Sequence, residues 1–248
     1  MKVFQYAINI DHISSSQLEC LKTFASKERL ERVKMFRYEE DVKRSILAEI
    51  IVKYEICKHF GIDMDEITFD QMEYGKLFVK GHPELCFNLS HSGKWVVCAL
   101  SNKPVGIDVE EVKDDCISIA KRFFTLKENE RINACKSANE KKQEFFQLWT
   151  LKESYMKEIG LGFHKSLNSF EMRKNNQMEQ VYDEGRLISN CKFDKYRLGD
   201  DYWVSICSEN EEIGEVTIEN LDEILGKRCT YNKLVNKFYQ KQRYVTGN

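Results

Sequence analysis

Hydrophobic residues recur along the chain with two different periods, and this pattern predicts a mixed α+β protein. Residues 39–60 carry apolar side chains at helical spacing and end at Gly61, which indicates one long amphipathic helix. Shorter apolar runs bounded by turn residues indicate strands at residues 1–10, 67–69, 76–79, 86–89 and 95–100. The first part of the chain is therefore predicted to contain a strand, a long helix and then a group of strands.

The same plan returns about one hundred residues later, which indicates an internal duplication. The second set of predicted elements comprises a strand, two short helices and a long helix, at residues 105–110, 118–122, 126–135 and 139–159. The long helix again ends at a glycine, Gly160, and strands follow it.

We therefore expect an α+β fold that is a pseudo-twofold duplication of two similar α+β halves with a ligand cleft between them. The halves are predicted to span residues 1–103 and 104–248. The second includes a C-terminal extension from about residue 227 whose sequence resembles no family known to us.

Size and charge narrow the functional classes. At 248 residues and 42% hydrophobic content the chain can bury one large core or two modest ones. Lys and Arg number 38 against 40 Asp and Glu, a balance that speaks against nucleic-acid and membrane-surface partners. Because no apolar run approaches the roughly 20 residues of a membrane span and no signal peptide is visible, a cytoplasmic protein is expected.

The nine cysteines are scattered without a CxxC pair, which is typical of reduced thiols. A zinc site from His82, Cys86, His91 and Cys98 is a weaker alternative, because Cys86 and Cys98 lie in apolar runs and the spacing is not a standard one.

Two acidic clusters carry the candidate chemistry. In the strand at 105–110, Asp108 and Glu110 point to the face opposite the apolar residues, because strand side chains alternate. In the long helix, Glu153 and Lys157 lie one turn apart on the face that Phe146 and Trp149 would bury. Each cluster alone also has a structural interpretation without function. Asp108 and Glu110 could be the solvated face of an edge strand, and Glu153 and Lys157 a surface salt bridge. Together, three convergent carboxylates suit a hard cation such as Mg²⁺.

The first half supplies residue types that bind phosphate. Arginine, lysine, serine and histidine beside turns can donate hydrogen bonds to phosphate oxygens. The candidates are Arg29, Arg32, Arg44, Ser45, Lys76, Ser90 and His91. Taken singly, the arginines also fit solvated helix charges, and residues 90–93 also fit ordinary hairpin turn chemistry.

Four motifs, in this order and spacing, resemble those of the 4′-phosphopantetheinyl transferases of the surfactin-synthetase-activating type. The motifs are FNLSHSG at 87–93, GIDVE at 106–110, KRFFT at 121–125 with Glu128, and WTLKE at 149–153 with Lys157. The similarity runs from about Lys27 to Phe170.

The resemblance implies a monomer with coenzyme A bound between its halves and Mg²⁺, or alternatively Mn²⁺, on the pyrophosphate. It assigns the metal to Asp108, Glu110 and Glu153, and the pyrophosphate to Lys157. The coenzyme A contacts that it implies are Arg44, Ser45, Lys76, Ser90 and His91. Arg29 and Arg32 stand where lysines are expected to meet the 3′-phosphate.

The activity implied is transfer of the 4′-phosphopantetheine arm to a serine of an acyl- or peptidyl-carrier protein, with release of adenosine 3′,5′-bisphosphate. Glu153 or Glu128 would take the serine proton, Glu128 having the alternative interpretation of a first-turn helix carboxylate. The carrier could serve fatty-acid, polyketide or nonribosomal-peptide synthesis. Two alternatives stay open: a non-catalytic protein that binds coenzyme A or a carrier, and a Mg²⁺-dependent pyrophosphatase.

Overall fold

The computed structural model describes residues 2–114, 117–176, 178–209 and 212–226. The predicted C-terminal extension from about residue 227 lies outside the described residues.

The first half packs a sheet against the long helix α3 (Glu39–Phe60), whose bounds are those predicted from the sequence. The sheet pairs β1 (Val3–Asn9), β5 (Trp95–Ser101) and β4 (Cys86–Ser92) in antiparallel order. The helices α1 (Ser15–Lys22) and α2 (Lys27–Val33) cover the far side of α3, and β2 (Phe69–Gln71) pairs with β3 (Leu77–Val79). An apolar core that includes Ile46, Ile50 and Val96 fills the space between sheet and helix.

The second half repeats this arrangement. Its sheet pairs β6 (Val105–Glu111), β11 (Tyr202–Ser208) and β10 (Lys192–Arg197), and the long helix α6 (Ala138–Ile159) lies on it. Two short helices and a second small sheet complete this half, at α4 (Ile117–Phe123), α5 (Leu126–Asn133), β7 (Phe170–Asn175), β8 (Met178–Asp183) and β9 (Arg186–Leu187). Two 3₁₀ turns, Gly162–His164 and Leu167–Ser169, connect α6 to β7. Each long helix ends at a glycine in the left-handed conformation, with φ of 69° at Gly61 and 73° at Gly160.

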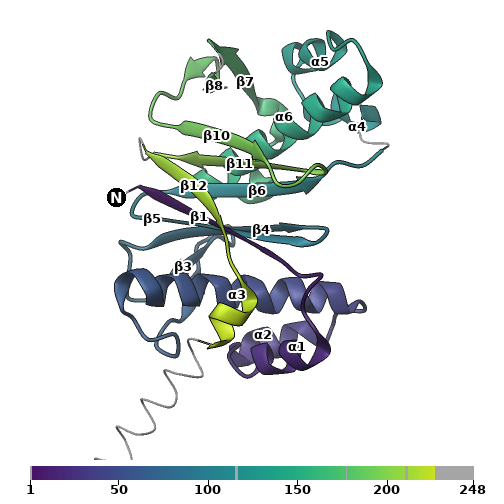
Figure 1. Ribbon diagram of the computed structural model, residues 1–248. Helices are drawn as coiled ribbons and strands as arrows, with labels where there is room; N and C mark the ends of the chain where they lie inside the picture. The colour runs from purple at the N-terminus through teal and green to yellow at the C-terminus, as the bar shows by residue number, and fades with distance from the viewer. Residues whose placement is uncertain (1, 115–116, 177, 210–211, 227–248) are drawn as a thin grey trace, which may run out of the picture.

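The two sheets face each other between the two long helices, so the molecule has four layers (Figure 1). The layer between the sheets is apolar and draws residues from both halves, among them Val97, Ala99, Ile107, Val109 and Val204. The structure thus confirms the predicted α+β class and its two similar halves.

The end of the described chain crosses back to the first half. Strand β12 (Ile213–Ile218) runs parallel to β1 and forms the edge of the first sheet. Leu221 and Ile224, which follow it, join the core around α3. Residues 213–226 therefore belong in space to the first half, although the predicted boundary assigns them to the second.

None of the helices in the described part of the chain combines the length and apolarity that a bilayer crossing requires.

Candidate active site

Gly106 lets α6 lie directly against β6. A Cβ atom at this position would come within 2.0 Å of the Ser154 carbonyl oxygen and 2.5 Å of the Glu158 amide nitrogen. No side chain fits there, because both atoms belong to the helix backbone. The glycine of the GIDVE motif thus sets the distance at which Glu153 and Lys157 of α6 face the carboxylates of β6.

Asp108 is the centre of a hydrogen-bond network that joins the halves. Its carboxylate is buried, and Oδ1 accepts from Lys157 Nζ at 2.7 Å and from Ser90 Oγ at 2.9 Å. Lys157 Nζ also donates to Ser90 Oγ at 2.9 Å. Because Ser90 lies on β4 and Lys157 on α6, the network spans the interface between the two sheets.

Burial raises the pKa of all three carboxyl groups, and the charge of Asp108 adds to the shift at Glu110 and Glu153. Burial, and then the charge of Asp108, raise the pKa of Glu110 to about 7. A hydrogen bond that Ser92 Oγ donates to Glu110 at 2.9 Å opposes this shift. Burial, and then Asp108, also raise the pKa of Glu153. Lys157 opposes the shift at Asp108, where burial still raises the pKa. The site thus contains three buried or half-buried carboxyl groups and the facing ammonium group of Lys157. When the carboxyl groups are ionised, negative charge is in excess.

A divalent cation fits this excess of negative charge. In the described part of the chain, Asp108 Oδ2 is buried and accepts no hydrogen bond, so one oxygen of the central carboxylate is available as a ligand. Carboxylate oxygens are the donors that Mg²⁺ prefers. The carboxylate oxygens of Asp108, Glu110 and Glu153 do not all lie within 4.8 Å of one another. Among the described residues, the potential metal ligands that do lie this close together are Glu158, Cys191 and Cys207.

Cationic and polar groups gather beside the carboxylates. Arg44 donates to the Gly93 carbonyl at 2.6 Å and pairs with Asp41 at 2.5 Å, which holds it at the turn after β4. Desolvation and then the charges of Arg44 and Lys157 lower the pKa of His91, so its imidazole lies in the field of both cations. The structure therefore brings Arg44, Ser90, His91 and Lys157 together with the acidic trio.

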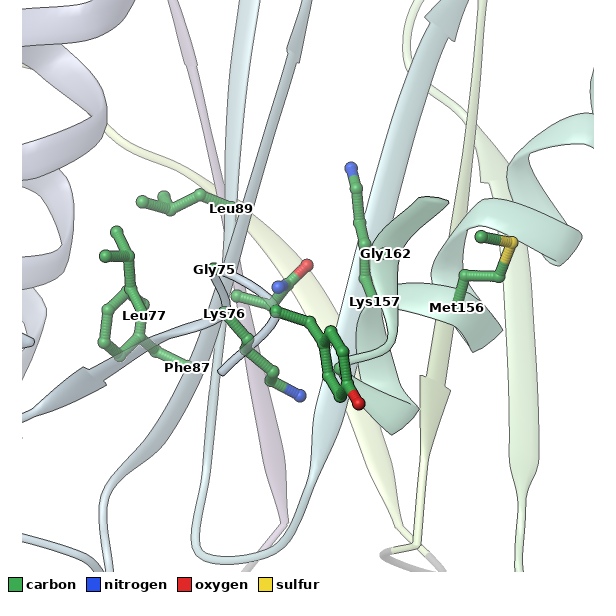
Figure 2. Close-up of a pocket in the computed structure, with 11 residues that line it drawn as sticks. Gly75, Lys76, Leu77, Phe87, Leu89, Met156, Lys157 and Gly162 are labelled. Carbon is green, nitrogen blue, oxygen red and sulfur yellow. The ribbon is translucent and has the colours of Figure 1, made fainter. Parts of the chain in front are cut away.

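A pocket of about 270 Å³ opens between the halves beside this network. Figure 2 shows Lys76, Leu77, Phe87 and Leu89 of the first half on one wall and Lys157 of α6 on the other. Lys76 Nζ donates to the carbonyls of Glu158 at 2.6 Å and Val105 at 3.2 Å, and desolvation lowers its pKa. The pocket therefore has an apolar wall and two ammonium groups.

The remaining phosphate candidates do not line this pocket. Arg29 donates to Ser45 Oγ and to Glu49, both at 3.1 Å, and these contacts tie α2 to α3. Arg32 lies exposed on α2.

Glu128 lies in a buried structural network, which argues against its predicted role as a base. Its Oε1 accepts from Lys152 Nζ at 2.5 Å and from the Met172 amide at 2.7 Å, and its Oε2 accepts from the Thr125 amide at 2.8 Å. Both side chains of the Glu128–Lys152 pair are 0% exposed. With both oxygens bonded and no solvent access, this carboxylate cannot reach a substrate hydroxyl. Its spacing from Thr125 is that of a capping box, a signal visible in the sequence.

The alternative zinc set is not brought together either. His82 pairs with Glu84 at 3.2 Å in a turn, whereas Cys98 is fully buried in the core of the first half.

Comparison with known proteins agrees with the motifs. A family model described as the 4′-phosphopantetheinyl transferase superfamily matches residues 104–207, and one described as 4′-phosphopantetheinyl transferase, N-terminal, matches residues 12–103. The chain is 32% identical over 222 residues to the 4′-phosphopantetheinyl transferase Sfp of Bacillus subtilis (strain 168), which covers 89% of this chain and 99% of the relative. It is 36% identical over 202 residues to the 4′-phosphopantetheinyl transferase gsp of Aneurinibacillus migulanus, which covers 81% and 83%.

Among solved structures, a holo-[acyl-carrier-protein] synthase of Thermotoga maritima matches with a TM-score of 0.37 and 20% identity, over 42% of this chain and 61% of that one.

Proposed function

The chain belongs to the 4′-phosphopantetheinyl transferase superfamily, and from this premise we propose that it transfers the 4′-phosphopantetheine arm of coenzyme A to a serine of an acyl- or peptidyl-carrier protein. In this step the serine oxygen bonds to the β-phosphorus, the pyrophosphate bridge breaks, and adenosine 3′,5′-bisphosphate leaves. Both sides of the pocket come from one chain, which supports action as a monomer.

The observation that carries the proposal is the acidic trio with its single facing ammonium group. Asp108, Glu110 and Glu153 would hold Mg²⁺ or Mn²⁺, and the unbonded Oδ2 of Asp108 supports this assignment. The cation would neutralise charge on the pyrophosphate oxygens.

Lys157 would donate to a phosphate oxygen of the substrate. Its side chain is 27% exposed, so it can exchange its contact with Asp108 for one with the ligand. Ser90 and His91 stand beside it as further donors, and Lys76 as a cation at the opposite wall. Arg29, Arg32, Arg44 and Ser45 stay predicted contacts of the nucleotide end.

Glu153 is the proposed proton acceptor. It is half-buried, which leaves it accessible to a serine hydroxyl directly or through one water.

The test is mass spectrometry of apo-carrier proteins after incubation with coenzyme A and Mg²⁺. We expect the carrier to gain one phosphopantetheine group at its serine. Asp108→Asn and Glu153→Gln should lose transfer and keep the thermal melt, whereas Glu130→Gln, an exposed acid on α5, should match the parent. Free phosphopantetheine with an unmodified carrier would instead indicate a pyrophosphatase, and an unmodified carrier without product would contradict the assignment.

The predicted coenzyme A contacts are tested by calorimetric measurement of coenzyme A binding to two further variants. Lys76→Ala and His91→Ala should weaken coenzyme A binding more than they lower kcat, because they position phosphates and transfer no proton. Unchanged affinity in both would remove them from the site.

A further inference from the structure

A second group of metal-ligand side chains lies in the second half, outside the acidic trio. It comprises Glu158 near the end of α6, Cys191 just before β10, and Cys207 on β11. One ligand atom from each lies within 4.8 Å of those of the other two. Figure 1 shows α6 packed over β11, the strand that carries Cys207, and near β10, which directly follows Cys191.

The group is buried and poorly satisfied. Glu158 is 5% exposed, Cys207 is 0% exposed, and Cys191 is the most accessible member at 9%. The hydrogen bond described for the Glu158 carboxylate comes from the Cys191 thiol at 4.0 Å, a weak donor at long range. Lys76 lies nearby but donates to the Glu158 main-chain carbonyl.

Burial opposes the charged forms of Glu158 and Cys207 while no cation is bound. It raises the pKa of Glu158 to about 7, and it raises the pKa of the Cys207 thiol well above its ordinary value. Burying a carboxyl group beside two thiols costs free energy unless a partner binds their oxygen and sulfur atoms. A thiophilic divalent cation does so, because it binds thiolate and carboxylate together and replaces their protons.

We propose that Glu158, Cys191 and Cys207 form a zinc site. Two thiolates and one carboxylate oxygen make three protein ligands, and a water molecule on the side of Cys191 supplies the fourth position that zinc takes in tetrahedral geometry. Binding releases both thiol protons. The sulfur ligands favour zinc over Mg²⁺, which takes oxygen ligands, so the two sites select different ions.

The site would fasten the end of α6 to the sheet beneath it. Glu158 directly follows Lys157, the cation of the acidic trio. A zinc ion here would hold that turn of α6 against β10 and β11 and would stabilise the fold independently of the transfer reaction.

The experiment uses the full chain, reduced, stripped with a chelator and titrated with Co²⁺ alone. We expect one equivalent to give a thiolate-to-cobalt charge-transfer band that Zn²⁺ displaces, and Zn²⁺ to raise the melting temperature. The band should vanish in Cys191→Ala/Cys207→Ala. It should persist in Cys98→Ala, which removes a buried thiol elsewhere, and in Asp108→Asn, whose oxygen ligands give no such band.

Glu158→Gln keeps both thiols and should weaken Co²⁺ binding at least about tenfold, which gives a second readout if the double variant fails to fold. Absence of the band in the parent protein would overturn the proposal, as would its persistence in the folded double variant. Formation of a Cys191–Cys207 disulfide in a protein that binds no Co²⁺ when reduced would overturn it too.

Discussion

Replacing Glu128 by Gln tests whether this residue is structural or catalytic. The change leaves the Lys152 ammonium group fully buried without its counter-charge, although the Phe170 carbonyl, at 2.7 Å, still accepts from it. Removing one partner of a buried ion pair costs about 3–5 kcal/mol, and the lower end is expected because the Gln oxygen can still accept one hydrogen bond. For a chain of this size about 3 kcal/mol corresponds to a melting temperature lower by about 6–12 °C.

The loss of stability in Glu128→Gln should also depend on pH. Burial already lowers the pKa of Lys152, and losing the Glu128 charge lowers it further. The folded variant then binds this proton less tightly than the unfolded chain, so its stability should improve as pH rises.

Urea denaturation of the parent, Glu128→Gln and the exposed control Glu130→Gln measures the free energy of unfolding, and single-turnover transfer measures the chemical step. We expect the control within about 0.5 kcal/mol of the parent. Glu128→Gln should retain transfer below its unfolding temperature. A loss of less than about 1 kcal/mol together with a hundredfold slower transfer would refute the structural role and restore Glu128 as a base.

Three further predictions follow from the packing. Gly106→Ala should push α6 away from β6, because its Cβ would lie 2.0 Å from a backbone oxygen; we expect a loss of about 1–3 kcal/mol and a rate lower by about a hundredfold, with Gly226→Ala, which meets nothing within 4 Å, as control. An unaltered rate in Gly106→Ala would show that this distance does not matter. Burial and then Glu219 raise the pKa of Glu55 from 4.5 to about 7, so the folded chain keeps a proton that the unfolded chain loses, and stability should fall as pH rises from about 4.5 to 7. Glu55→Gln should flatten this decline in thermal melts, and a parallel decline in both proteins would assign it to other groups. Asp108→Ala should abolish Mg²⁺-dependent stabilisation in calorimetric melts, and a preserved Mg²⁺ effect would move the metal elsewhere.

Local patterns predicted the long elements well, because their signals lie within the elements themselves. Helix α3 spans the predicted residues 39–60, and its end depends on one glycine in the left-handed conformation. The alternation in β6 placed Asp108 and Glu110 on one face, and the structure brings them into the same electrostatic cluster as Glu153.

Pairings between distant segments were not predictable in this way. Glu49 is 2% exposed beneath Arg29, and Lys152 is fully buried against Glu128. Neither pairing could be predicted from the sequence, because charged side chains are mostly exposed. The motif resemblance assigned Glu128 to the chemistry, whereas its spacing from Thr125 fitted a capping box. The return of β12 to the first sheet carries no local signal, because its partner β1 lies at the other end of the described chain.

The pairing of β12 with β1 has a consequence for folding during synthesis. The Gln5 side chain donates to the Gly214 carbonyl, a contact that joins residues 209 positions apart. During synthesis the first half leaves the ribosome long before residues 213–218, so β1 waits with an unpaired edge, open to pairing with another chain. Strand β12 closes that edge and links the second half of the chain to the first sheet. We therefore expect that shielding of the nascent first half, for instance by a chaperone, raises the yield of folded protein.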